Sequence, residues 1–216
     1  MEVSKKILVV IVAVMATSLW ADVYTFRPSH PTLNDLPHQC YFTWGVKWEL
    51  PQGEEITSAT LTFKNIWNQT REPNILYTHL LDDVPDPNGS PSYQAVGTGK
   101  HAYERITIIE TDSQGEGDSF ADWPGDHVLL GMWTDNHGGQ PRNFDLVYNI
   151  SSDHFGMLAN GAFGFGIDPD CHYFNDGITF SIVTSPAVPA PAAMGLGAIG
   201  LAIVFWSKRF LGKREG

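Results

Sequence analysis

Residues Phe42-Thr-Trp-Gly-Val-Lys-Trp-Glu-Leu50 alternate strictly between large apolar side chains and polar or small ones. Side chains of a β-strand point alternately to its two faces, so a period of two predicts a strand with one buried face. The even positions would face a hydrophobic core, with Trp44 and Trp48 among the core residues. The odd positions would face away from it.

The same alternation recurs four more times between residues 22 and 186, and no segment there carries a convincing helical period. Three further runs are apolar on both faces, which is typical of central strands. Turn residues separate the runs. Eight or nine short strands of this kind predict an all-β fold, an antiparallel β-sandwich that is jelly-roll-like. The alternating runs are residues 59–64, 144–150, 163–167 and 178–182, and the apolar runs are residues 75–81, 105–111 and 128–134.

The N-terminus carries the pattern of a secretory signal peptide. Lys5 and Lys6 precede an apolar core, residues 7–15, and small residues follow it. This order of basic, apolar and small residues is that of a segment removed on export. We therefore expect residues 1–21 to be cleaved, after Ser18 or Ala21.

The C-terminus carries a second targeting pattern. The motif Val188-Pro189-Ala190-Pro191-Ala192 leads into the apolar segment 192–206, and a basic tail, residues 207–216, ends the chain. A bilayer-spanning helix needs about 20 apolar residues, so a segment of this length favours a transient anchor. The basic tail would remain on the cytoplasmic side. An ordinary single-pass anchor is the alternative.

This tail resembles the PEP-CTERM sorting signal of bacteria that secrete exopolysaccharide. The resemblance covers residues 187–216 only. Val188, Pro189, Pro191 and Ala192 match the motif, and Ala190 stands where the family usually has Glu. The resemblance implies processing by an exosortase-like enzyme and a place at the cell surface or in the extracellular matrix.

The remaining segment, residues 22–186, has the length of one domain. The chain has a net charge of −11; residues 1–21 contribute +1 and residues 207–216 contribute +3, so the part between carries −15. This charge argues against nucleic-acid binding, which requires a basic patch. Both cysteines, Cys40 and Cys171, lie in this segment, and an oxidising compartment predicts a disulfide between them. Two free buried thiols are the alternative.

The stretch between Asp168 and Gly177 holds the densest group of oxygen-bearing side chains: Asp168, Asp170, Asn175 and Asp176. Carboxylate and amide oxygens are the ligands of calcium, although the spacing is not that of an EF-hand. Asp82, Asp83 and Asp112 lie at strand ends and would complete such a site. A plain loop with an Asn-Asp-Gly turn is the alternative.

Two other patterns bear on catalysis. Gly117-Asp118-Ser119 resembles the nucleophile block of the GDSL hydrolases, but it lies mid-chain and the family's Asp-x-x-His element is missing near the C-terminus. The eight histidines show no zinc-ligand spacing. We therefore expect no catalytic residues, and no enzyme.

Trp67 and Trp123 lie next to turns, where an exposed ring can stack on a sugar. The sequence thus predicts an exported protein whose sandwich domain has a structural or adhesive role, with an exosortase-like enzyme and the membrane as partners. The alternatives are a carbohydrate-binding module, which calcium would assist, and a secreted hydrolase. Extracellular polysaccharide would be the ligand of such a module.

Overall fold

The computed structural model describes residues 21–28, 31–82, 94–95, 103–110, 117–141 and 143–187. The chain divides into two compact units, Met1–Ser185 and Pro186–Gly216, and the first of them contains the β-sheets. Apart from Ala21, the expected signal peptide lies outside the described residues, as do the sorting motif, the membrane helix and the basic tail. Within the described ranges, no helix is long and apolar enough to cross a bilayer.

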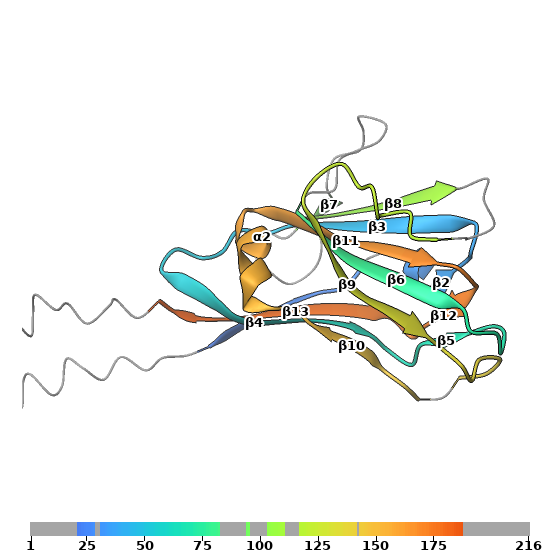
Figure 1. Ribbon diagram of the computed structural model, residues 1–216. Coiled ribbons are helices and arrows are strands. Elements are labelled where there is room, and N and C mark those ends of the chain that lie inside the picture. The colour runs from blue at the N-terminus through green and yellow to red at the C-terminus, as the bar shows by residue number, and fades with distance from the viewer. Residues whose placement is uncertain are drawn as a thin grey trace, which may run out of the picture. The chain divides into compact units, whose positions relative to one another are not determined.

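The domain consists mainly of antiparallel β-sheets, which confirms the all-β prediction (Figure 1). The first sheet has the strand order β1-β13-β4-β10. Its strands are β1 (Asp22–Phe26), β13 (Ile178–Pro186), β4 (Glu54–Phe63) and β10 (Leu146–Asn149).

A six-stranded sheet has the order β7-β8-β3-β11-β6-β9, and a three-stranded sheet the order β2-β12-β5. The six strands are β7 (Gln94–Ala95), β8 (Tyr103–Glu110), β3 (Cys40–Lys47), β11 (Ala162–Pro169), β6 (Ile75–Leu81) and β9 (His127–Thr134). The three are β2 (Asp35–Leu36), β12 (Tyr173–Phe174) and β5 (Trp67–Asn68).

The strand pairs are nested along the chain. The first strand, β1, pairs with the last, β13, and each later pair lies inside the one before: β2 with β12, β3 with β11, β4 with β10, and β6 with β9. The chain is thus paired like one long hairpin. The segment between β6 and β9 supplies β8, which adds to the outer side of β3.

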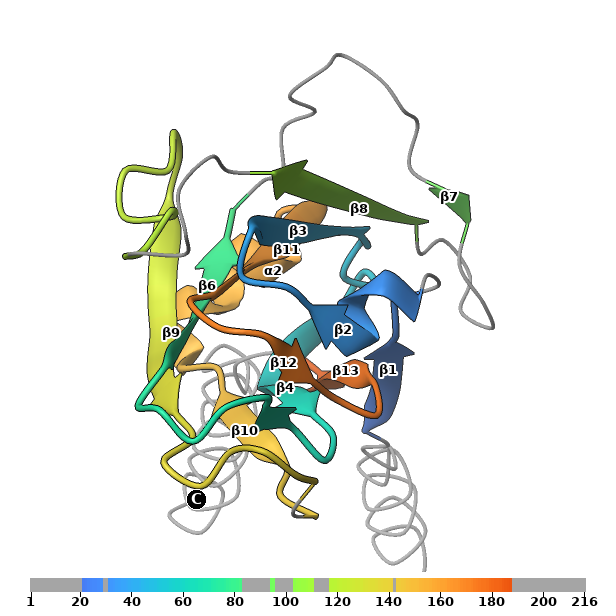
Figure 2. The same ribbon diagram turned by 90° about the vertical axis from the view of Figure 1, so that its right-hand side faces the viewer.

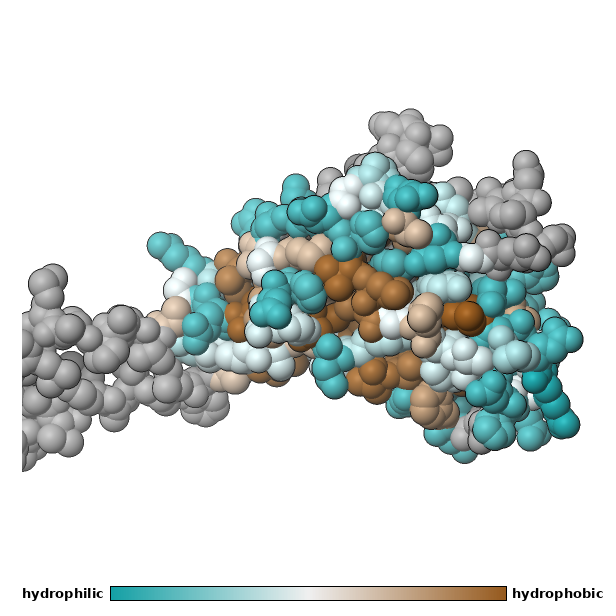
Figure 3. Space-filling model, viewed as in Figure 1, coloured by the Kyte–Doolittle hydropathy of each residue, from teal (hydrophilic) through white to brown (hydrophobic). Residues whose placement is uncertain are grey.

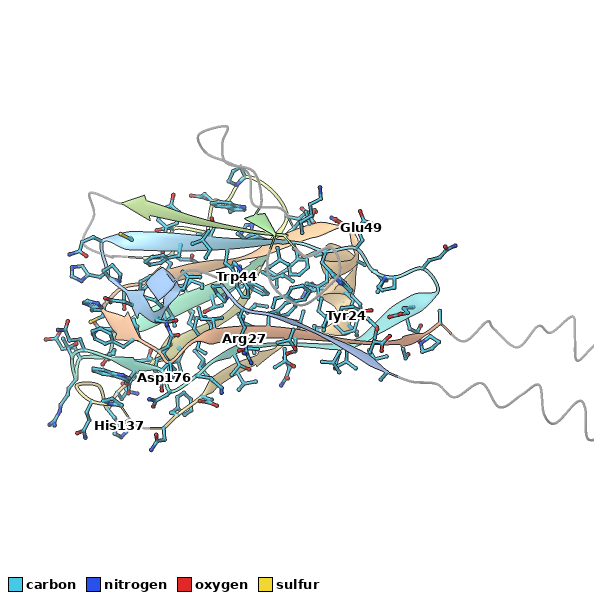
Figure 4. All side chains as sticks on the ribbon, turned by 180° about the vertical axis from the view of Figure 1, so that it is seen from behind. Tyr24, Arg27, Trp44, Glu49, His137 and Asp176 are labelled. Carbon is cyan, nitrogen blue, oxygen red and sulfur yellow. The ribbon has the colours of Figure 1, made fainter. Side chains whose placement is uncertain are left out.

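The two larger sheets enclose the hydrophobic core between their facing sides (Figure 1). Phe163 and Phe165 of β11 meet Phe180 of β13 with ring centroids 5.4 and 4.8 Å apart. Trp44 is fully buried and lies between the layers (Figure 4). Because each buried side chain of this size contributes about 1.5–3 kcal/mol, these rings supply much of the folding free energy.

The N-terminal and C-terminal ends of the domain lie next to each other, on the same side. Asp22 at the start of β1 is paired with Thr184 near the end of β13. The three-stranded sheet lies at the opposite end of the domain, which we call the tip (Figure 1). Viewed onto the tip, β2 and β12 lie across the gap between the two larger sheets (Figure 2).

Every run that the sequence predicted as a strand contains one, and Trp44 and Trp48 are core residues as expected. The sequence missed β1 and the two-residue strands. It also missed one short helix, α2 (Phe155–Ala159), and two 3-10 turns, Pro31–Asn34 and Ser152–His154. The two-residue strands, the helix and the turns are too short to show a period, and in β1 the exposed apolar Val23 interrupts the alternation.

The predicted disulfide is wrong, because Cys40 and Cys171 are not bonded to each other. The β3–β11 ladder ends at the pair Phe42 and Ile167, and the chains diverge beyond it. Cys40 continues β3 alongside β8. Asp170 follows β6 by donating its backbone N–H to Ile75, and the next residue, Cys171, has its Sγ 3.5 Å from Thr70 Oγ1.

Candidate functional site

Residues 117–123 form a loop over the outer face of the six-stranded sheet, and we call it the outer-face loop. The sheet accommodates it because β11 alternates Phe163, Phe165 and Ile167 on the core side with small residues on the other. Phe120 of the loop is fully buried against Gly166, where an added Cβ would lie 2.7 Å from the ring. A glycine is therefore required beneath this ring.

A histidine and a carboxylate fix the start of this loop. His79 Nε2 lies 3.0 Å from both carboxylate oxygens of Asp118, and His79 is only 1% exposed. Asp118 also accepts the backbone N–H of Phe120, at 3.0 Å. Burial lowers the pKa of His79, and the neighbouring Asp118 opposes this. Neutral His79 therefore donates Nε2–H to Asp118.

A second carboxylate holds the next residue of the loop. Ser119 donates its backbone N–H to Asp168 Oδ2 at 2.6 Å. Asp168 extends from the outer face of β11 and is 5% exposed. Burial raises the pKa of its carboxyl group, whereas the hydrogen bonds from Ser119 lower it. The loop is thus held by two carboxylates, one from the loop itself and one from the sheet.

Tyrosines lie next to these carboxylates on the same face. Tyr77 of β6 is directly opposite Asp168. Burial raises the pKa of both Tyr77 and Tyr41, and the negative charge of Asp168 adds to the rise. Asp170, one residue beyond β11, accepts the backbone N–H of Ile75. Burial raises the pKa of Asp170 to about 6, and nearby Asp168 adds to the rise. The result is an acidic cluster with aromatic neighbours.

The arrangement does not match a serine hydrolase. A catalytic serine needs a base within reach of its hydroxyl group. Among the described hydrogen bonds, Ser119 binds Asp168 and His79 binds Asp118, so the histidine and the serine are bound to different carboxylates. Ser119 is held as part of a loop attachment.

The four residues that the sequence offered for calcium point to different partners. Asp168 and Asp170 each accept a backbone N–H group at the end of β11. Asn175 donates to the Leu33 carbonyl, and Asp176 accepts from Asn65 Nδ2 at 2.9 Å. In the part of the chain that the structure describes, no three His, Cys, Asp or Glu side chains are placed to hold a metal ion. The calcium site stays a prediction.

Of the other acidic residues considered for that site, the structure describes Asp82. Asp82 accepts a hydrogen bond from Asn160 Nδ2 at 2.6 Å. Asp83 and Asp112 lie outside the described residues. Asp176 lies toward the tip, as does His137, at the far end of the domain from Tyr24 (Figure 4).

Trp67 and Trp123 lie on different surfaces. Trp67 at the tip stacks on Phe174, with centroids 4.7 Å apart, and His172 stacks on the same phenylalanine at 4.6 Å. Trp123 packs against Phe120 of the outer-face loop, at 5.1 Å. Each tryptophan is half-buried and has a neighbouring ring against it.

The sequence identified Ser119, Asp168 and Trp123 separately, and the structure brings them to one face. It missed His79 and Asp118 as a pair. Residues 75–81 are apolar at odd and even positions alike, so the usable signal was a titratable histidine, His79, within a mostly apolar run. No family model matches this chain, and a search of curated proteins finds no relative.

Proposed function

We propose that this is an exported bacterial protein of the cell surface or extracellular matrix, with a structural or adhesive domain and no catalytic activity. Its domain is a β-sandwich of the jelly-roll kind, which is supported by four nested strand pairs that alternate between the two larger sheets. The tail, residues 187–216, is its sorting signal and is processed by an exosortase-like enzyme.

One observation carries the proposal: the two ends of the domain are paired side by side, Asp22 with Thr184. A domain built this way can be attached through its C-terminal linker while the tip remains directed outward. The separate partners of Ser119 and His79 support a non-catalytic role.

Deletion of residues 188–216 tests the attachment. The truncated protein should appear in the medium, while the full chain stays with the cells until processed. Removal of residues 207–216 alone shows whether the basic tail is needed for attachment, because it leaves the motif and the apolar segment in place. Retention of the larger deletion on the cells would contradict the proposal.

Carbohydrate binding is a second candidate function. The observation that favours it is the ring of Tyr77, half-buried on the outer face, because an aromatic ring can stack on a sugar. The full chain should then be retained on extracellular polysaccharide, and Tyr77→Ala should weaken the retention. Equal retention of both proteins would remove this function from the outer face.

A further inference from the structure

The outer-face loop packs on a histidine that has one ring nitrogen without a partner. His79 is 1% exposed, and its Nε2 lies 3.0 Å from both carboxylate oxygens of Asp118. Among the described residues, its other ring nitrogen, Nδ1, has no hydrogen-bond partner. The neutral ring leaves only an acceptor unpaired. The imidazolium ion would bury a charged N–H donor with no acceptor, which costs more.

A single ring seats the loop on the sheet. Phe120 is fully buried over Gly166, and its ring centroid lies 5.4 Å from that of His79. Ser119 and Asp122 are exposed, and the surface over the loop is largely hydrophilic (Figure 3). The loop can therefore leave the sheet by exposing one fully buried hydrophobic side chain.

The contacts of Phe120 are separate from the main core. Phe120 and Leu81 form a small hydrophobic cluster of their own, and the large core cluster lies between the two larger sheets. Beside them, Thr43 and His79 flank Gly166 on the adjacent strands. Thr43 is also 1% exposed, and its Oγ1 has no partner among the described residues. Departure of the loop would leave the core packing in place and bring water to this polar face.

Charged and titratable groups from three elements act on His79. Asp118 of the loop and Asp168 of β11 favour its protonation, whereas His127 of β9, with its ring centroid 5.7 Å away, opposes it. Burial has the largest effect, and the pKa of His79 is lowered from 6.5. A pKa that is lower with the loop closed than with it open means that the closed form loses stability as pH falls below 6.5.

We propose that the outer-face loop is an acid-released cover: protonation of His79 detaches residues 117–123 from the six-stranded sheet while the sheets stay folded. At neutral pH, the neutral ring donates Nε2–H to Asp118 and the loop is closed. In acid, the imidazolium ion gains its missing hydrogen-bond partner from water only when the loop has moved away. The device thus exposes the polar face around Gly166 in response to pH.

The carboxyl group of Asp168 titrates in the opposite sense. Burial raises its pKa, so the closed form gains stability from this group as pH falls toward 3.8. The effect of His79 is therefore isolated by a variant that lacks only its titration. His79→Gln is that variant, because a glutamine amide can donate to Asp118 and does not titrate. His127→Gln is the matched control, since it removes the neighbouring histidine and keeps His79.

Hydrogen exchange of the full chain, corrected for the intrinsic rate at each pH, measures the release. The backbone N–H groups of Ser119 and Phe120, which bind Asp168 and Asp118, report on the loop. In the wild type and in His127→Gln, exchange of residues 117–123 should rise between about pH 7 and about pH 5, by up to about tenfold per pH unit for one proton. Residues 163–167 should stay protected, and His79→Gln should show no such rise.

A wild-type loop that stays protected at about pH 5 would overturn the inference, and so would an equal rise in His79→Gln. Loss of protection in residues 163–167 would also overturn it, because acid would then unfold the sheet instead of releasing the loop. An NMR titration of the His79 ring in the wild type does not depend on how the variants fold. It should give a pKa below 6.5, and a value at or above 6.5 would reverse the direction of the effect.

Discussion

The outer-face loop and the tip each pack closely against a glycine, but the atoms that contact the glycine differ. At Gly166 the obstacle to a Cβ is the ring of Phe120, at 2.7 Å. At Gly138, in the loop after β9, the obstacles are Asn68 Oδ1 at 1.4 Å and the backbone oxygen of Thr70 at 1.7 Å. The loop can yield by moving a side chain, whereas the tip would have to move backbone.

The hydrogen bonds also indicate that the tip is held more rigidly than the outer-face loop. Asn68 at the tip is fully buried, and its side chain and its backbone carbonyl bind backbone groups of Asp135, at 3.3 Å, and Gly139, at 2.8 Å. The outer-face loop depends on His79, whose pKa is lowered by burial, and on Asp168, whose pKa is raised by burial. We therefore expect the tip to be the more rigid region and the outer-face loop to respond to pH.

Gly138→Ala should have the largest effect. Because backbone must shift to make room, we expect the free energy of unfolding to fall by about 3 kcal/mol or more, as measured by urea denaturation of the full chain. Gly156→Ala is the control, since Gly156 lies in α2 with nothing within 4 Å of an added Cβ. A loss no larger than the control's would contradict the rigid tip.

Gly166→Ala should cost less, about 2 kcal/mol, because Phe120 can swing away from the added methyl group. The displacement should alter the fluorescence of Trp123, which packs on Phe120. If this variant proved as destabilising as Gly138→Ala, the proposed difference between the regions would be lost.

Asp118→Asn should produce a loss that depends on pH. Asp118 raises the pKa of His79, so its removal lowers that pKa further below 6.5. A folded-state pKa below the unfolded value means that stability is lost as pH falls. We expect a small change at pH 8 and a loss of about 1–2 kcal/mol at pH 5, measured by urea denaturation. Equal losses of stability at both pH values would show that Asp118 does not affect the protonation of His79.

Asp170→Asn should stabilise the protein at neutral pH. The folded-state pKa of Asp170 is raised from 3.8 to about 6, so its ionisation costs stability as pH rises through this range. The group is partly solvated, and we expect a gain of about 1 kcal/mol at pH 7 that disappears below pH 3.8. Thermal melting at the two pH values would measure it, and a gain that persists in acid would have another cause.

A reducing agent should have the smallest effect. Because no disulfide joins Cys40 and Cys171, the melting temperature of the full chain should be unchanged on reduction. A decrease of several degrees would mean that the two segments approach closely enough to form the bond.

The period of two in residues such as Trp44 and Phe165 predicted the all-β class and the core, because that signal is local to each strand. Pairing was not predictable in the same way: β1 and β13 are brought together across the whole domain. The attachment of Asp118 to His79 is also non-local, and the two cysteines looked paired only because their compartment favours a disulfide.

The central claim, export followed by processing of the tail, is tested most directly by the mass of the protein recovered from the cell surface or medium. Intact-mass spectrometry should show a chain that begins after Ser18 or Ala21 and ends near residues 188–192. Recovery of the full chain from Met1 to Gly216 as the only form would contradict the account.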